Sequence, residues 1–222
     1  MSTKKKEPFK YDYSEEKPTF VEEPLIKYPA LNLDLSKRYT YADYLTWLDD
    51  KLRELIDGIV HFFASPVRIH QEVSHKLNYL FSEFIYKRRG KCQIYYAPFA
   101  VRLPVDNSTD DNKIYNVVLP DICVVCDPSK LDDKGCIGAP DLIVEILSPS
   151  TAKTDWTKKF NLYQASGVRE YWIADPKEKV INVFLLKPDG KFDDGTVYFC
   201  HEKVPVYIFD GLEIDLKEVF EE

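Results

Sequence analysis

The feature that most constrains the fold is a short apolar run, Leu142–Leu147, which contains a single carboxylate, Glu145. Pro140 and Pro149 bound the run, and a short stretch of Leu, Ile and Val between prolines is typical of a strand buried on both faces. A charge in such a strand is costly to bury unless it is paired or binds a metal. Glu145 is therefore a candidate site residue, unless it lies at a strand end in solvent.

A second apolar run, Val117–Val125, lies about twenty residues upstream and carries one carboxylate, Asp121. Neighbouring strands lie about 4.8 Å apart, so two inward carboxylates on adjacent strands can bracket one divalent ion. Asp141 shares a strand face with Glu145, but four strand residues span about 13 Å, too far to share a metal. Oxygen ligands favour Mg²⁺ or Mn²⁺, which can promote phosphodiester hydrolysis. For Asp121 too, a solvent-exposed strand end is the alternative.

The bulk composition limits the classes of protein to which the chain can belong. Its 222 residues suffice for one large domain, and its net charge of −7 argues against coating nucleic acid through bulk charge. A local basic groove in an enzyme is still compatible with that charge. No apolar run approaches the roughly 20 residues of a membrane span, and the polar start shows no signal peptide. We therefore expect no membrane association and a cytoplasmic location.

The cysteines give a weak signal. There are five, an odd number, scattered along the chain. This pattern is not a disulfide framework and favours a reducing cytosol. Cys123 and Cys126 resemble half of a zinc site, but positions three apart on a strand point to opposite faces. A redox or zinc protein is therefore the disfavoured alternative.

The order of the expected elements indicates an α/β (α+β) domain with a mixed central β-sheet flanked by helices. Residues 1–38 hold four prolines among mixed charges and are expected to form an extended arm, and 39–222 a single domain. We expect helices at 41–49, 69–89 and 155–167, and a hairpin around Asp57-Gly58. Strands are expected at 92–103, 117–126, 142–147, 170–174, 180–186, 196–200 and 204–209, before a final turn at 212–220.

A cation should complete a phosphodiester site, and helical geometry distinguishes two lysines. At 100° per residue, Lys159 lies about 65° from the face that three aromatic residues define as buried, and Lys158 about 165° away, in solvent. The three aromatic residues are Trp156, Phe160 and Tyr163. Lys159 is therefore the candidate cation.

Three further residues have open alternatives. Asp155 lies one turn before Lys159, so an exposed i,i+4 ion pair between them is the simpler interpretation. Glu54 begins the expected hairpin and is either a third acid or a solvent-facing strand residue. His70, in the first turn of the helix at 69–89, either faces the site or serves as a cap or surface residue.

Several motifs together resemble the Uma-type restriction endonuclease family of the PD-(D/E)XK nuclease superfamily. The chain has Pro-Asp at 120–121, E-I-L-S-P-S-T from Glu145, D-x-x-x-K-x-x-x-Y from Asp155, and S-G-V-R-E-Y-W-I-A-D-P from Ser166. The resemblance also takes in E-L-I-D-G from Glu54 and S-P-x-x-x-H at 65–70, and it covers about residues 38–220.

The resemblance implies a restriction-endonuclease-like core with a metal, Mg²⁺ or Mn²⁺, held at the strand ends. Asp121 and Glu145 match the two metal-binding acids, and Glu54 the extra acid from the first element. The superfamily places a lysine two residues after the second acid, where this chain has Leu147. The family takes its lysine from the following helix, a position that Lys159 matches.

The same resemblance implies a Mg²⁺-dependent endonuclease that hydrolyses DNA, with Asp121, Glu145, Lys159 and Glu54 as catalytic residues. His70, Asp155 and Tyr163 are accessory candidates. The alternative is a catalytically inactive nuclease-fold protein that serves as a binding or assembly module, which the acidic composition and Leu147 favour. DNA is the expected partner. The sequence leaves open whether the protein forms a homodimer.

Overall fold

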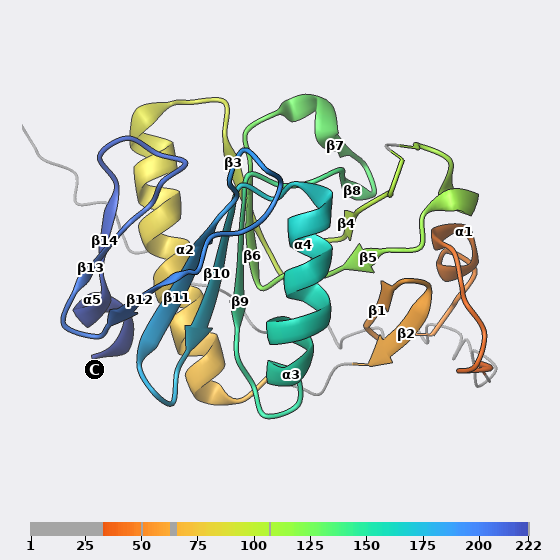
Figure 1. The fold of residues 1–222 in the computed structure, drawn as a ribbon, viewed down its shortest axis with the longest axis horizontal. Coiled ribbons are helices and arrows are strands. Elements are labelled where there is room, and N and C mark those ends of the chain that lie inside the picture. The colour runs from red at the N-terminus through yellow and green to blue at the C-terminus, as the bar shows by residue number, and fades with distance from the viewer. Residues whose placement is uncertain (1–32, 50, 63–65, 107, 222) are drawn as a thin grey trace, which may run out of the picture.

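The computed structural model describes residues 33–49, 51–62, 66–106 and 108–221, and Figure 1 shows their arrangement. The helices are α1 (Tyr41–Tyr44), α2 (Arg68–Arg88), α3 (Ala152–Thr154), α4 (Phe160–Ser166) and α5 (Leu216–Phe220), with 3₁₀ turns η1 (Asp111–Lys113) and η2 (Pro128–Lys130) and a π-helical segment η3 (Asp155–Lys159).

Within these described ranges, the strands form two six-stranded sheets and one short hairpin. In spatial order, the first sheet holds β2 (Ile59–Phe62), β1 (Arg53–Ile56), β5 (Val117–Val118), β4 (Val101–Arg102), β8 (Gly135–Ile137) and β7 (Leu131–Asp132). The second holds β12 (Thr196–Phe199), β11 (Val180–Leu185), β10 (Glu170–Asp175), β9 (Leu142–Ile146), β6 (Ile122–Val125) and β3 (Gln93–Tyr96). The hairpin is β13 (Lys203–Pro205) with β14 (Glu213–Asp215).

The second sheet is the centre of the molecule and is covered on both faces. Its β9–β10 pair is parallel and its other pairs are antiparallel, so the sheet is mixed. Helix α2 lies against one face and α4 against the other (Figure 1). Along β9, Leu142, Val144 and Ile146 pack on the α2 side, whereas Ile143 packs on the α4 side. The predicted α+β class, with a mixed central sheet flanked by helices, is confirmed.

The two strongest local signals of the sequence are also confirmed. The hairpin of β1 and β2 turns at Asp57 and Gly58, both with positive φ, as a tight two-residue hairpin turn requires. Helix α2 buries Val73, Leu77 and Phe81 on one stripe. It ends at Arg89, which adopts the left-handed conformation.

Two predicted strands are instead divided between the sheets. The stretch 92–103 becomes β3 in the second sheet and β4 in the first, with the cis Ala97–Pro98 bond between them. The stretch 117–126 becomes β5 and β6, separated at Pro120. Proline has no N–H to donate to a strand ladder, so each proline marks the crossing from one sheet to the other. These crossings bring β1, the partner of β5, close to the start of β6.

The C-terminal predictions are wrong in part. The strand expected at 204–209 ends at Pro205, and the expected final turn contains β14 and the helix α5. Val204, Ile214 and Leu216 join the core on the α2 side, which explains why this segment is ordered as a hairpin and helix.

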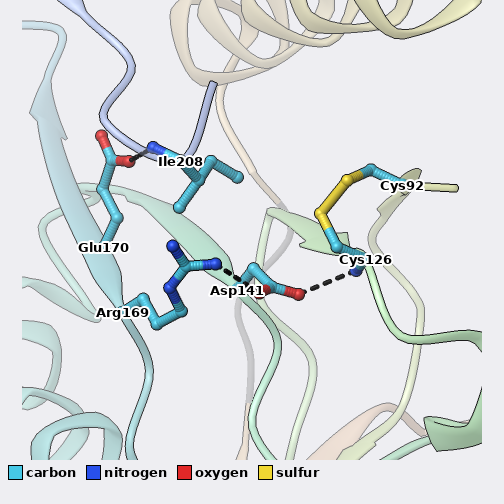
Figure 2. Close-up of a disulfide and its surroundings, with 6 residues drawn as sticks. All are labelled: Cys92, Cys126, Asp141, Arg169, Glu170 and Ile208. Atoms are coloured by element: carbon cyan, nitrogen blue, oxygen red, sulfur yellow. Dashed lines mark hydrogen bonds and ion pairs between the residues drawn. A yellow bond between two sulfur atoms is a disulfide. The ribbon is translucent and has the colours of Figure 1, made fainter. Parts of the chain in front are cut away.

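The prediction that the cysteines are not a disulfide framework is wrong for one pair. Cys92 and Cys126 form a disulfide between β3 and β6 (Figure 2), while Cys123 is a buried free thiol. The strand register pairs Gln93 with Val125, so the next residues outward are the two cysteines. Cys123 and Cys126 are therefore separated, as the strand argument predicted.

Most of the predicted arm, residues 1–32, lies outside the described residues. Of its last part, Leu33 packs beside the cluster around Tyr41, and Arg38 donates a 2.7 Å hydrogen bond to the carbonyl of Asp57. Within the described ranges, no helix has the length and apolar character needed to cross a membrane.

Glu170 generates a stability prediction. Its buried carboxylate accepts a 2.7 Å hydrogen bond from Trp172 Nε1. It also accepts a 2.9 Å bond from the Ile208 N–H (Figure 2). Glu170→Ala should lower the free energy of unfolding by about 2–4 kcal/mol, because both donors lose their acceptor. Urea unfolding measures this, with exposed Glu178→Ala as the control. Equal effects would contradict an anchoring role for Glu170.

Candidate active site

Asp121 and Glu145 lie at one end of the central sheet. The register pairs Ile122 of β6 with Val144 of β9, so one further step places Asp121 opposite Glu145. The strands are thus neighbours, as predicted. Glu145 is buried, and the Asp121 side chain is 18% exposed. Neither acid lies free in solvent at a strand end.

Glu54 joins these acids from the first sheet. The strand β1 pairs with β5 through Leu55 and Val117, just before the chain crosses into β6. The Glu54 carboxylate is buried and accepts a 2.8 Å hydrogen bond from the N–H of Leu119. The solvent-facing alternative for Glu54 is therefore wrong.

Lys159 lies between the two sheets. Its Nζ is 2.9 Å from Glu54 Oε1, 2.9 Å from Glu145 Oε1 and 3.7 Å from Asp155 Oδ1. All four side chains are buried, so the pair of Lys159 with Asp155 exists but is not an exposed one. Lys158, one residue earlier, is exposed, as predicted.

The π-helical segment η3 explains how the helix presents these residues. A π turn contains more residues than an α turn, so 100° per residue does not apply here. Asp155 and Lys159 both face inward, whereas Trp156, predicted to be buried, is 40% exposed. Isolated π turns inside helices are frequent at functional sites.

Two of the accessory candidates contact the acids directly. The Tyr163 hydroxyl donates a 2.6 Å hydrogen bond to Glu145 Oε1. His70 is buried, with Nε2 3.3 Å from Asp121 Oδ2, which also accepts a 2.7 Å bond from the Ile146 N–H. His70 thus faces the site, and the cap of α2 is Val67.

Negative charge exceeds positive charge in this cluster. Burial raises the pKa of Glu145 well above its usual value and that of Asp155 to about 6, against the lowering effect of Lys159. Burial lowers the pKa of Lys159, but the surrounding carboxylates outweigh it and the net shift is upward. The pKa of His70 is likewise raised, because the contact with Asp121 outweighs burial. The excess of carboxylates favours binding of a further cation.

A cavity of about 490 Å³ opens onto these groups and is lined by Asp121, Glu145, Lys159 and His70. Asp121 makes its contacts through Oδ2 and Glu145 through Oε1. The second oxygen of each carboxylate, Asp121 Oδ1 and Glu145 Oε2, is therefore the candidate ligand of a cation. Carboxylate oxygens from two opposite strand positions that line a cavity are suitable ligands for Mg²⁺ or Mn²⁺.

The described residues contain no group of three or more His, Cys, Asp or Glu side chains arranged to hold a metal. Mg²⁺ usually binds one or two carboxylates and completes its shell with waters and substrate phosphates. Lys159 occupies the space between Glu54 and Glu145, so Glu54 is placed to fix the lysine. The residues present thus fit an ion held by Asp121 and Glu145.

Asp141 is not brought into the site. It lies at the other end of β9, where Oδ2 accepts a 2.7 Å bond from the Cys126 N–H and Oδ1 a 3.0 Å bond from Arg169 (Figure 2). Sequence reasoning also missed the apolar wall of the cavity, which includes Leu52, Phe62 and Pro98. Apolar residues at the end of a hairpin carry no sequence signal that separates them from core residues.

The fold is that of a nuclease-like protein. A crystal structure described as "a putative nuclease belonging to DUF820" from Anabaena variabilis superposes with a TM-score of 0.65 at 20% identity. The match covers 82% of this chain and 97% of that one. At this identity the likeness shows the fold alone.

The chain belongs to the family described as "Putative restriction endonuclease" (Uma2), which matches residues 41–216. The resemblance noted in the sequence is thereby confirmed. The chain is also similar to an uncharacterized protein, slr1290, of Synechocystis sp. PCC 6803, with 27% identity over 152 residues, 67% of this chain and 74% of that protein. The family description supports a nuclease function in general.

Buried Asp155 predicts a pH dependence of stability. Burial raises its pKa from 3.8 to about 6, so between these values the folded state retains a proton that the unfolded state releases. The stability contributed by that proton is present at low pH and is lost as pH rises through this window, by up to roughly 3 kcal/mol. Asp155→Asn should therefore gain stability relative to the unmodified protein as pH rises. Urea unfolding in EDTA across the window measures this, and identical pH profiles would contradict it.

Proposed function

We propose that this protein is a metal-dependent endonuclease that hydrolyses phosphodiester bonds of DNA. The observation that carries the proposal is the position of Lys159, whose ammonium lies 2.9 Å from both Glu54 and Glu145 beside an open cavity. A cation and two cavity-lining acids from separate elements are the groups that phosphodiester hydrolysis needs. The family description supports the same class of reaction.

Each residue has a distinct role in this proposal. Asp121 and Glu145 hold one Mg²⁺ or Mn²⁺, which supplies Lewis acidity when bound. The Lys159 ammonium stabilises the negative charge that develops on the attacked phosphate. Glu54 and Tyr163 fix Lys159 and Glu145 respectively through the contacts above.

His70 has a supporting role in the same proposal. Its Nε2 contacts Oδ2 of Asp121 and so orients that carboxylate, which leaves Oδ1 for the ion. Asp155 lies 3.7 Å from Lys159 and adds to the field that keeps the lysine charged.

The second candidate function is a catalytically inactive nuclease-fold protein that acts as a binding or assembly module. Leu147 stands where the superfamily has its lysine, and this substitution favours the inactive reading. The hydrogen bond from Lys159 to Glu145 favours the catalytically active alternative, because Lys159 supplies from the helix the cation that is missing at position 147.

The proposed setting is the cytoplasm, with a homodimer as the assembly to be tested. Cys123, Cys136 and Cys200 are free thiols, which a reducing compartment would preserve. The Cys92–Cys126 disulfide is the observation that speaks against such a compartment. Thiol alkylation of the protein in intact cells tests the setting, and sedimentation tests the assembly.

Metal binding is the first test of the proposed site. Mn²⁺ should bind between Asp121 and Glu145, and Asp121→Asn or Glu145→Gln should weaken it about tenfold or more, because each removes a charged ligand. Asp141→Asn, at the residue that directly precedes the strand of Glu145 and is bonded to Arg169, is the matched control. Calorimetric titration and anomalous scattering from a soaked crystal measure the site, and an ion located elsewhere would contradict it.

Cleavage is the second test. Lys159→Met should lower single-turnover cleavage of plasmid DNA about 100-fold or more, because it removes a preorganised charge from the transition state. Lys158→Ala, one residue away and exposed, should cause only a modest, salt-dependent loss.

Folding must be measured in the same samples, because Lys159 is buried against two carboxylates. Breaking such a cluster typically costs about 3–5 kcal/mol, so rates are normalised to the folded fraction from circular dichroism. Equal losses of cleavage rate in the two variants would contradict a catalytic role for Lys159. Complete inactivity of the unmodified protein on DNA and RNA would favour the inactive alternative.

A further inference from the structure

The cavity has an apolar wall that faces its charged floor. The wall consists of Leu52, Phe62, Pro66, Ala97, Pro98 and Leu119. Phe62 and Leu52 are 53% and 51% exposed, which is unusual for apolar side chains beside a cluster of buried charges. The metal, the acids and Lys159 can engage a phosphate, but none of them uses this wall.

Phe62 is held in its exposed position by a buried cation. The guanidinium carbon of Arg53 lies 5.5 Å from the centroid of the Phe62 ring and 5.5 Å from that of Trp47. Arg53 is itself buried and is fixed by a bidentate ion pair with Asp49. The strand register places Arg53 opposite Phe62, so the pair is built into the hairpin. Phe62 is therefore a preorganised ring with one side available to a ligand.

The flat face of a base is the ligand chemistry that suits such a ring. Stacking of a base on an aromatic side chain contributes to nucleic-acid binding and tolerates any sequence. Lys51 lines the same cavity from an exposed position and can meet a neighbouring phosphate. The cavity, at about 490 Å³, is within the size range of sites that enclose a small ligand.

The charge of the chain points to the same class of substrate. A duplex binds mainly through its phosphates, and a net charge of −7 with four carboxylates in the site gives little support for that mode. Bases in a duplex are also stacked and paired, so their faces are unavailable to Phe62 until they are extruded. A single strand offers its base faces without that cost.

We propose that the cavity takes an unpaired nucleotide whose base stacks on Phe62, so that the substrate is single-stranded or locally unpaired DNA. This inference rests on the proposed function, because it places the phosphate of that nucleotide at Lys159 and the acids. Phe62 acts as a specificity-determining residue that contacts the substrate and takes no part in bond breaking.

Binding without cleavage tests the proposal. Fluorescence anisotropy in EDTA compares a labelled oligothymidylate of about 12 nucleotides with a duplex of equal length. We expect tighter binding of the single strand, and Phe62→Ala should weaken it about tenfold or more. Phe62→Trp should retain binding, and its indole fluorescence should be quenched when the strand is added.

Phe199→Ala is the matched control. Phe199 is 51% exposed on the edge strand β12, outside the cavity, so its loss should leave strand affinity within about twofold. Equal losses in Phe62→Ala and Phe199→Ala, or tighter binding of the duplex, would overturn the proposal.

A cleavage assay with Mg²⁺ on the same DNAs and variants, run beside the binding experiment, separates this inference from the proposed activity. Phe62-dependent binding of single strands by a protein that cleaves no nucleic acid supports the inference and removes the catalytic proposal. Cleavage of duplex and single strand at equal rates, unaffected by Phe62→Ala, supports the endonuclease and overturns the inference.

Discussion

The interaction on which the structure depends is the burial of one ammonium, that of Lys159, among carboxylates from different elements. Glu54 belongs to the first sheet and Glu145 to the second, so the lysine connects two sheets that share no strand pairing. A buried charge without a partner destabilises a protein far more than a buried pair stabilises it. The cluster therefore fixes the positions of β1, β9 and the helix after β9 relative to one another.

The two sheets meet where the chain contains proline. Pro98 and Pro120 each lie where the chain leaves one sheet and enters the other. Asp121 directly follows the second of these crossings, and Leu119, which directly precedes it, donates its N–H to Glu54. The same break in the strand ladder thus ends β5 and positions two of the acids. The break at Pro120 therefore determines both where the chain changes sheets and where these acids lie.

Much of the core followed from the sequence because the signals are local. The burial of Glu145, the hairpin at Asp57-Gly58 and the apolar stripe of α2 all depend on a few neighbouring residues and their periodicity. The adjacency of Asp121 and Glu145 was also predictable, since both lie in runs too apolar for an edge. The burial of Glu54 was not predictable from local signals, because it depends on β5, a strand distant in sequence; only the family resemblance pointed to Glu54 as a site residue.

The failures of prediction have physical reasons as well. The disulfide depends on the register of β3 and β6, which spacing between cysteines does not encode. Trp156 was assigned to the buried face by α-helical geometry, and the π-helical segment rotates it outward. The exposed position of the Phe62 ring depends on its contact with Arg53. The strand register of the hairpin creates that contact, and the sequence alone does not give this register.

The π-helical segment also affects how the chain can vary in length. A π turn is in effect an α-helix with one residue inserted, so its excess residue can be lost without breaking the helix. Such a deletion between Asp155 and Lys159 would replace the wide turn by a regular α turn, and it would rotate the upstream residues relative to α4 by far less than the roughly 100° that the loss of a residue from a regular α-helix causes. Asp155 and Lys159 would both still face the interior. The interval between these two residues is therefore the part of the helix best able to accept the loss of one residue.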